Sequence, residues 1–224
     1  MFCAAGMKAP VSEIAKQYEE ECGVEVQIQY GGSGALLSSL SVGVGDVYLA
    51  ADSSYLQRAK ASGLVAEVMP VAFLRAGLGV PVGNPLGLSR MEDLGRSDLR
   101  VGLANPDFSA VGQFSKKTLS QHGMWQRVNP TVLLPTVNDL MNALKLGTVD
   151  VVVCWDAVAN QYAEIDFVGL PEFETERKSV AIGVLTQSPQ PTEARQFCHY
   201  LTSKEKGFLV FEANGYEEIS ESAE

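Results

Sequence analysis

Residues 24–35 read VEVQIQYGGSGA, and this stretch joins a strand pattern to the start of a helix. Apolar and polar residues alternate from Val24 to Tyr30, which predicts a strand. Residues 31–34 are all glycine or serine and interrupt the pattern, and residues 35–42 are expected to form a helix. A strand, a short glycine turn and a helix in this order are typical of α/β proteins.

The same succession of strands and helices continues on both sides of this stretch. The spacing of apolar residues predicts strands at residues 2–5, 24–30, 46–50, 71–80, 100–104, 131–134, 149–155 and 179–186, and helices at residues 8–21, 35–42, 53–61, 111–121, 137–146, 156–162 and 192–201. Parallel strands need a crossover between them, usually a helix. This order therefore predicts parallel sheets that are covered by helices on both faces.

The amino-acid composition limits the classes of molecule that this chain can bind. The chain has 224 residues, with 17 Lys and Arg against 27 Asp and Glu, which gives a formal net charge of −10. This length accommodates one large domain or two lobes. Binding to DNA or RNA through phosphate neutralisation needs clusters of Lys and Arg, so we expect no nucleic-acid partner. A small anion can still bind in a local pocket, because net charge describes the surface as a whole.

The four cysteines do not form a metal-binding pattern. No CxxC spacing occurs, and neither His122 nor His199 lies near a cysteine pair, so we expect no structural zinc site. Cys3, Cys154 and Cys198 stand in apolar strand or helix contexts, where we expect buried free thiols. One disulfide stays open as an alternative for an exported protein, although no spacing selects a pair.

Two sequence features bear on the cellular compartment. No apolar run reaches the roughly 18 residues that a membrane-spanning helix needs. The first residues also lack the basic region and the apolar segment of a signal peptide. The chain is therefore either cytosolic or the exported form of a protein whose signal peptide has been removed.

Several predicted strands end in loops of small or polar residues at which a helix begins. In open α/β sheets, ligands bind at the carboxyl ends of strands, where helix N-termini present free N–H groups and a partial positive charge. Glycine lets a ligand approach the backbone closely, and serine adds a hydroxyl donor. Several such ends together could hold a tetrahedral oxyanion without Lys or Arg. These loops are residues 4–8, 31–35, 105–112, 135–139 and 154–157.

Each candidate residue also has an ordinary structural interpretation. Ser33 has an equally good interpretation as a helix cap. As a nucleophile it would need a histidine base, and the sequence pattern does not supply one. No Gly-Lys-Ser/Thr follows, so the stretch is not a P-loop, and Ala35 replaces the last glycine of a Gly-x-Ser-x-Gly elbow. Trp155 is either a core aromatic or an indole N–H donor. Asp46 and Asp52 are each expected to cap a helix or to lie in a turn.

The order and spacing of these segments resemble the molybdate-binding proteins of ABC transporters over nearly the whole chain. The segments that carry the resemblance are Phe2–Met7, Glu13–Ala15, Tyr30–Leu36, Asp46–Asp52, Ala104–Pro106, Val111–Gly112, Asp150–Ala157 and Phe197–Tyr216. The resemblance implies an α/β periplasmic-binding protein of type II, with two Rossmann-like lobes joined by a two-segment hinge. Lobe 1 is then expected at residues 1–74 plus 183–224 and lobe 2 at residues 75–182, with hinge strands at 71–80 and 179–186.

The resemblance also implies an oxyanion site between the lobes, with hydroxyl and backbone N–H donors. On lobe 1, Ser33 falls on a serine that binds ligand in the family. Gly6, next to Met7, falls where the family commonly has another ligand-binding serine. Gly6 offers no hydroxyl, so one side-chain donor of the family is lost here.

On lobe 2, Val111 and Leu140 fall on positions whose backbone N–H groups contact the oxyanion in the family. Trp155 falls where a tyrosine hydroxyl usually reaches the ligand. A donor lost or changed costs about 1–3 kcal/mol when it leaves a charged group short of a hydrogen bond. The ligand is therefore molybdate or tungstate with a rearranged donor set, another oxyanion, or a larger ligand that uses the room beside Gly6.

The resemblance implies a substrate-binding component that closes on its ligand and delivers it to the membrane permease of an ABC transporter. We expect a monomer in the periplasm or at the cell surface, with no catalytic residue, no cofactor and no side chain that ligates a metal cation directly. Two alternatives stay open. One is a cytosolic sensory domain of the same fold, and the other is a serine hydrolase that uses Ser33.

Overall fold

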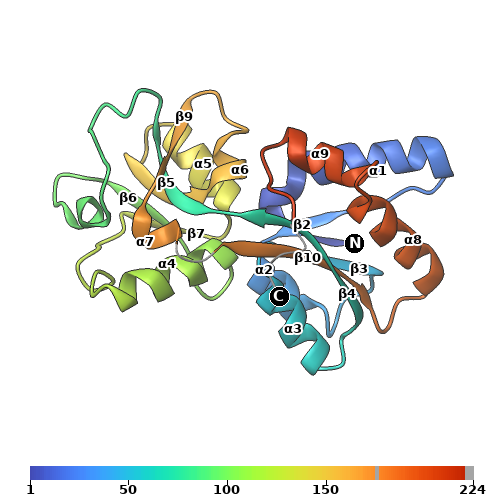
Figure 1. Ribbon diagram of the computed structural model, residues 1–224. Coiled ribbons are helices and arrows are strands. Elements are labelled where there is room, and N and C mark those ends of the chain that lie inside the picture. The colour runs from blue at the N-terminus through green and yellow to red at the C-terminus, as the bar shows by residue number, and fades with distance from the viewer. Residues whose placement is uncertain (175–176, 220–224) are drawn as a thin grey trace. The chain divides into compact units, whose positions relative to one another are not determined.

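The computed structural model describes residues 1–174 and 177–219, and the chain divides into two compact units. The first unit contains residues 1–74 and the described residues from Lys178 on, and the second contains the described residues from Arg75 to Arg177. Each unit has its own five-stranded sheet (Figure 1). In the part of the chain that the structure describes, no helix is both long enough and apolar enough to span a membrane.

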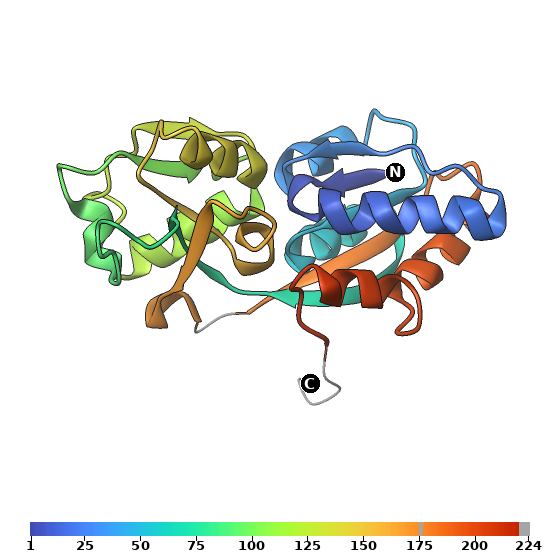
Figure 2. The same ribbon diagram turned by 90° about the horizontal axis from the view of Figure 1, so that it is seen from above.

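The first unit has the strand order β2-β1-β3-β10-β4. Helices α1, α8 and α9 cover one face of this sheet and α2 and α3 the other (Figure 1), and Figure 2 shows α1 beside α8 and α9. Its elements are β1 (Phe2–Ala4), the 3-10 helix η1 (Ala5–Met7), α1 (Lys8–Cys22), β2 (Gln29–Gly31), α2 (Ser33–Ser39), β3 (Val47–Ala50), α3 (Ser53–Ala61), β4 (Val65–Leu74), β10 (Lys178–Leu185), α8 (Pro191–Thr202) and α9 (Gly207–Ala213).

The second unit has the strand order β7-β6-β8-β5-β9. Helices α5 and α6 lie on one face of its sheet, with α4 and α7 on the other (Figure 1). Its elements are β5 (Ala76–Pro81), the 3-10 helix η2 (Met91–Gly95), β6 (Val101–Ala104), α4 (Ala110–Gln121), β7 (Val132–Leu134), α5 (Val137–Lys145), β8 (Val151–Trp155), α6 (Asp156–Ala159), β9 (Ile165–Gly169) and α7 (Pro171–Glu174).

Both sheets are mixed, so the prediction of purely parallel sheets is wrong in part. β1 pairs in parallel with β2 and β3, and β6 pairs in parallel with β7 and β8. β10 runs antiparallel to β3 and β4, and β5 runs antiparallel to β8 and β9. β5 and β10 are the first strands after the two passages of the chain between the units, so each enters its sheet from the other unit rather than from a crossover helix of its own unit.

The strand-like run at residues 71–80 is divided between the two units. β4 ends at Leu74 in the first sheet, and β5 begins at Ala76 in the second. The return passage lies just before Lys178, and β10 pairs with β4 from that residue on. Residues 178–182, which the sequence placed in the second lobe, therefore lie in the first unit.

Local chemistry explains where the helices begin and end. Gly23 ends α1 in the left-handed region, with φ of 70°. Asp52 caps α3 by accepting a hydrogen bond from the Ser54 N–H at 2.9 Å. Thr136 and Asp139 form a reciprocal capping box at the start of α5. The predicted capping role of Asp52 is thus confirmed.

The core of each unit is apolar and centred on its sheet. All five residues of β8 are buried, in keeping with a central strand that is covered on both faces. Cys3, Cys154 and Cys198 are buried free thiols, as predicted, and Cys22 is an exposed free thiol. Burial raises the pKa of the Cys198 thiol to about 12, which keeps it protonated and unreactive at neutral pH.

Candidate functional site

The carboxyl ends of β1 and β2 lie at the same edge of the first sheet, because the two strands pair in parallel. η1 follows β1 and α2 follows β2, which brings Gly6, Met7 and Ser33 to this edge. β3 pairs in parallel with β1 and ends at the same edge, just before Asp52. The structure therefore groups the three residues that the sequence placed in the first lobe's site.

Ser33 is held from two sides by the third strand and the loop that follows it. The Ala51 N–H donates to Ser33 Oγ at 3.2 Å, and the Tyr48 hydroxyl donates to the Ser33 carbonyl at 2.7 Å. Ser33 is only 2% exposed. Because its oxygen accepts from Ala51, the serine still has its own proton to donate, and no described residue accepts that proton. Ser33 is thus a fixed donor at the edge of the sheet.

Gly6 and Met7 offer backbone rather than side-chain groups. Both residues are buried in η1. The Tyr216 hydroxyl donates to the Gly6 carbonyl at 2.8 Å and ties η1 to the chain segment that follows α9. The Met7 side chain is fully buried, so it fills the core below this edge.

A salt bridge neutralises the carboxylate at the end of β3. Lys178 Nζ lies 3.1 Å from Asp52 Oδ2, and both side chains are largely buried. An unpaired carboxylate at this edge would repel an anion, so the pairing makes the edge compatible with anion binding.

In the second unit, β6, β7 and β8 are parallel and end at one edge of their sheet. Helices α4, α5 and α6 follow these three strands. Val111 lies in the first turn of α4, Leu140 in the first turns of α5, and Trp155 at the end of β8. The three residues that the sequence placed in the second lobe's site are therefore at one edge as well.

The start of α4 offers free backbone donors. The first amide with a helical acceptor is that of Gln113, which donates to the Ser109 carbonyl at 2.9 Å. The amide of Val111 precedes it and has no acceptor within the helix. Gly112 lets the helix approach β6 closely, since a Cβ there would lie 2.5 Å from the Ala104 carbonyl oxygen.

Ser109 is a candidate that the sequence reasoning did not single out. It is the N-cap residue of α4 and is buried, yet its side chain makes no capping hydrogen bond. A serine at this position normally bonds to a first-turn amide. Its hydroxyl and the Val111 amide are therefore two unused donors at one helix start. Only the position of Ser109 at a strand-to-helix junction signalled this in the sequence.

The start of α5 differs from the expectation for Leu140. The Leu140 amide donates to the Thr136 carbonyl at 3.3 Å, and the Asp139 amide donates to Thr136 Oγ1 at 3.2 Å. The first-turn amides without a helical acceptor are those of Val137 and Asn138. Asn138 Oδ1 is also buried without a hydrogen-bond partner in the described part of the chain.

Trp155 lies in the core of its unit. Its side chain is 1% exposed, and its ring packs against Phe114 with 5.7 Å between ring centroids. The next residue, Asp156, accepts hydrogen bonds from the Arg75 backbone N–H at 3.1 Å, from Arg75 Nε at 3.2 Å and from the Ala157 N–H at 2.8 Å. Burial raises the pKa of the Asp156 carboxyl, although these hydrogen bonds act in the opposite direction.

Ser33 lacks the surroundings of a catalytic nucleophile. The described partner of its hydroxyl oxygen is the Ala51 amide rather than a base. His122 is engaged elsewhere, because its Nδ1 lies 3.0 Å from the Thr118 carbonyl oxygen. Among the described residues, no group of three or more His, Cys, Asp or Glu side chains is arranged to hold a metal ion.

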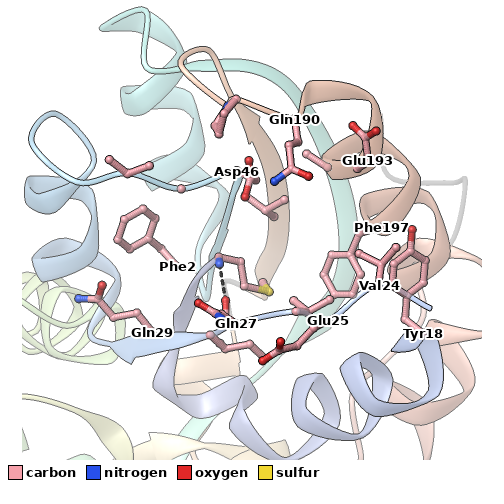
Figure 3. A pocket seen from close by; sticks show the side chains of 18 residues that line it. Phe2, Tyr18, Val24, Glu25, Gln27, Gln29, Asp46, Gln190, Glu193 and Phe197 are labelled. Atoms are coloured by element: carbon pink, nitrogen blue, oxygen red, sulfur yellow. Dashed lines mark hydrogen bonds between the residues drawn. The ribbon is translucent and has the colours of Figure 1, made fainter. Parts of the chain in front are cut away.

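A cavity of about 680 Å³ lies at the opposite edge of the first sheet (Figure 3). It is lined by Met1, by residues 24–29 and by residues 44–47, which precede or begin the strands. Helices α1 and α8 contribute Tyr18 and Phe197. The cavity is therefore separate from Gly6 and Ser33, which follow the carboxyl ends of the same strands.

Comparisons of sequence identify relatives along the whole chain. The family model described as "Bacterial extracellular solute-binding protein" matches residues 1–217. A Haemophilus influenzae protein with the provisional description of a binding protein is 28% identical over 220 residues, which cover 96% of this chain and 89% of the relative. The molybdate-binding protein ModA of Mycobacterium tuberculosis is 26% identical over 221 residues, which cover 96% of this chain and 83% of that protein.

Solved structures share the fold at lower sequence identity. The periplasmic molybdate-binding protein of Azotobacter vinelandii has a TM-score of 0.82 at 16% identity, covering 98% of both chains. The sulfate-binding protein SubI of Mycobacterium tuberculosis has the same TM-score at 15% identity, covering 98% of this chain and 86% of that one. The two-lobed α/β architecture of periplasmic-binding proteins is therefore confirmed for this chain.

Proposed function

The chain belongs to the family of bacterial extracellular solute-binding proteins, and from this we propose that it binds a tetrahedral oxyanion, with molybdate or tungstate preferred. Full-length similarity to a molybdate-binding protein supports this ligand class. The sulfate-binding neighbour shares the fold alone, at 15% identity.

The observation that carries the proposal is the hydroxyl of Ser33. It is buried at the carboxyl edge of the first sheet, it is fixed by Ala51, and its proton is free for a ligand oxygen. A neutral donor suits a fully ionised oxyanion, because it stabilises the charge without adding a titratable group. The nearby Asp52 carboxylate is neutralised by Lys178.

We assign the second unit's donors to two helix starts. At α4 the donors are the Val111 amide and the Ser109 hydroxyl, which compensates for the hydroxyl that Gly6 lacks. At α5 the donors are the Val137 and Asn138 amides, which precede Leu140 by three and two residues. Each helix start also adds a partial positive charge. Trp155 supports this edge by its packing against Phe114.

A ligand that takes donors from both units would favour a compact form by its higher affinity for that form. This coupling is how we propose that the permease of an ABC transporter recognises the loaded protein outside the cytoplasmic membrane. The protein acts as a monomer and releases its ligand unchanged, without a catalytic residue or a cofactor. Small-angle X-ray scattering should show a smaller radius of gyration with molybdate than without it.

Calorimetric titration with molybdate tests the donor set. Loss of a hydrogen bond to a charged ligand costs about 1.5–3 kcal/mol, so Ser33→Ala should weaken binding by roughly 10- to 100-fold. Ser38→Ala is the matched control, because Ser38 lies in the same helix and its hydroxyl donates to the Gly34 carbonyl. Ser109→Ala should also weaken binding, with Ser115→Ala as its control in α4. Equal affinities of Ser33→Ala and Ser38→Ala would contradict the proposal.

A further inference from the structure

Lys8 is an exposed cation at the edge of the first sheet that carries Gly6 and Ser33. It is the first residue of α1 and directly follows η1, which contains Gly6. Its Nζ lies 5.7 Å from the centroid of the Tyr30 ring. Tyr30 lies in β2, the strand that leads to Ser33 at the start of α2. Lys8 therefore reaches from the first of these strand-to-helix junctions to the strand that leads into the second.

The aromatic ring beneath Lys8 is fixed in position. The Tyr30 hydroxyl and Ser12 Oγ share a hydrogen bond of 2.7 Å. Ser12 lies one turn after Lys8 in α1, so both residues are on the same face of the helix and the ring lies across that face. A cation over an aromatic ring is attracted by the negative face of the ring. Tyr30 thus holds the ammonium group close to the sheet edge.

No acid balances the charge of Lys8. Within residues 1–174 and 177–219, Lys8 forms no ion pair with a carboxylate. In contrast, Lys178 lies 3.1 Å from Asp52, and Arg75 lies 3.2 Å from Asp156. These two ion pairs largely cancel the charges of their members, whereas Lys8 adds an uncompensated positive charge to the edge that carries Ser33.

The position of Lys8 does not favour the stability of its own helix. The N-terminus of a helix carries a partial positive charge, which favours acidic residues and disfavours a lysine. The first turn of α1 contains no acidic residue that would offset this. The chain as a whole has a net charge of −10, so an approaching anion is repelled. An uncompensated cation at this edge counteracts that repulsion locally.

We propose that Lys8 is a specificity-determining residue of the oxyanion site and makes the site prefer dianions to monoanions of the same shape. This inference rests on the proposed function, because it assigns recognition of the ligand's charge to one residue of that site. Neutral donors such as the Ser33 hydroxyl recognise the oxygens of a tetrahedral ion. The attraction by Lys8 is proportional to the charge of the ligand, so it separates ions that have the same arrangement of oxygens.

Tungstate and perrhenate are suitable probes, because they differ in charge but not in shape. Both are tetrahedral oxyanions of a heavy metal, and tungstate is a dianion whereas perrhenate is a monoanion. Calorimetric titration gives the Kd of tungstate, and displacement of tungstate gives the Kd of perrhenate. The natural chain, Lys8→Gln, Lys8→Arg and Lys16→Gln are compared at salt concentrations of about 0.1 M and about 1 M.

Lys16→Gln is the matched control. Lys16 is an exposed lysine of the same helix, and its Nζ lies 3.8 Å from Glu20. Its substitution changes the net charge of the chain by the same amount as Lys8→Gln. The two lysines are about 12 Å apart along the helix axis, which exceeds the Debye length of about 10 Å at 0.1 M salt. Lys8→Arg keeps the charge and should bind both ions as the natural chain does.

At the lower salt concentration, we expect Lys8→Gln to weaken tungstate binding about fourfold and perrhenate binding about twofold, because the Coulomb energy doubles with the ligand's charge. Both losses should shrink at the higher salt concentration. Equal losses for the two ions, or a tungstate loss no larger than in Lys16→Gln, would overturn the inference and leave oxyanion binding intact. If the natural chain binds neither ion, the proposed function fails, and this inference fails with it.

Discussion

The Tyr48 hydroxyl donates a hydrogen bond of 2.7 Å to the backbone carbonyl of Ser33, and both residues are buried. Tyr48 lies in β3, and Ala51, just after that strand, donates to the hydroxyl oxygen of the same serine. Burial raises the pKa of Tyr48, so the phenol keeps its proton at neutral pH and can donate. β3 and the loop after it therefore position Ser33 through two separate bonds.

Replacing Tyr48 with phenylalanine should lower the free energy of unfolding by about 1–2 kcal/mol, because the buried Ser33 carbonyl loses its partner. Urea unfolding measures this loss. The molybdate affinity should fall less than in Ser33→Ala, since the serine hydroxyl is still present. Tyr30→Phe is the control, because it removes an exposed hydrogen bond to Ser12. Equal stability of the two variants would show that the Tyr48 bond does not hold Ser33.

Gly6→Ser should strengthen oxyanion binding. Gly6 is not among the residues with positive φ, so serine can adopt its backbone conformation. The added hydroxyl supplies one more neutral donor at the edge that carries Ser33, and an improvement of about tenfold is expected. Gly6→Ala separates the hydroxyl from the added bulk. If both variants bind molybdate equally, or more weakly than the natural chain, Gly6 does not lie beside the ligand.

Gly112→Ala should disturb the start of α4. Its Cβ would lie 2.5 Å from the Ala104 carbonyl oxygen and 2.6 Å from that of Asn105, so the helix must move away from β6. Overpacking of this kind costs about 1–3 kcal/mol. We expect a lower Tm together with weaker molybdate binding. Gly95→Ala is the control, since the nearest atom to its Cβ is a side-chain carbon at 3.4 Å. Unchanged binding in Gly112→Ala would separate α4 from the site.

The ion pair between Arg100 and Asp150 should make stability depend on pH. Hydrogen bonds from the Arg100 side chain lower the pKa of the Asp150 carboxyl, and Arg100 Nε lies 3.1 Å from its Oδ2. A lowered folded-state pKa adds stability above the unfolded value of about 3.9, and this is lost as pH falls through the folded pKa.

Asp150→Asn should therefore cost about 1 kcal/mol of unfolding free energy at pH 7, a value limited by the solvent exposure of Arg100. The difference from the natural chain should shrink when urea unfolding is repeated at pH 3 and below. A difference that does not change with pH would mean that the charge of Asp150 does not contribute.

Local pattern predicted most elements of the fold. The helix at residues 53–61 is confirmed to the residue, because the Asp52 cap and the apolar spacing both mark it. The pattern at residues 71–80 predicts one strand, since nothing local shows that the chain changes sheets near Arg75. Residues 24–28 alternate as a strand does, but β2 begins only at Gln29. η2, β9, α7 and α9 were not predicted.

The sequence predicted which loops carry the candidate site, but not which groups in those loops are free to bind a ligand. Strand-to-helix junctions marked Ser33 and Val111 because parallel strands bring their carboxyl ends to one edge. Whether an amide in the first turn of a helix is free depends on the hydrogen bonds that the cap residue makes. The sequence therefore could not show that Leu140 is bonded to Thr136, or that Ser109 leaves its own helix uncapped. The sequence also could not show how deeply Trp155 is buried, because its ring packs against Phe114, which is distant in the sequence.

Thermal unfolding of the natural chain with molybdate, tungstate, sulfate or phosphate, and without ligand, tests the proposed function most directly. A ligand at 100 times its Kd stabilises the fold by about 2.7 kcal/mol, which raises Tm by several degrees in a chain of this size. We expect this rise with molybdate and tungstate and a smaller one with sulfate. No rise with any of the four ions would contradict oxyanion binding.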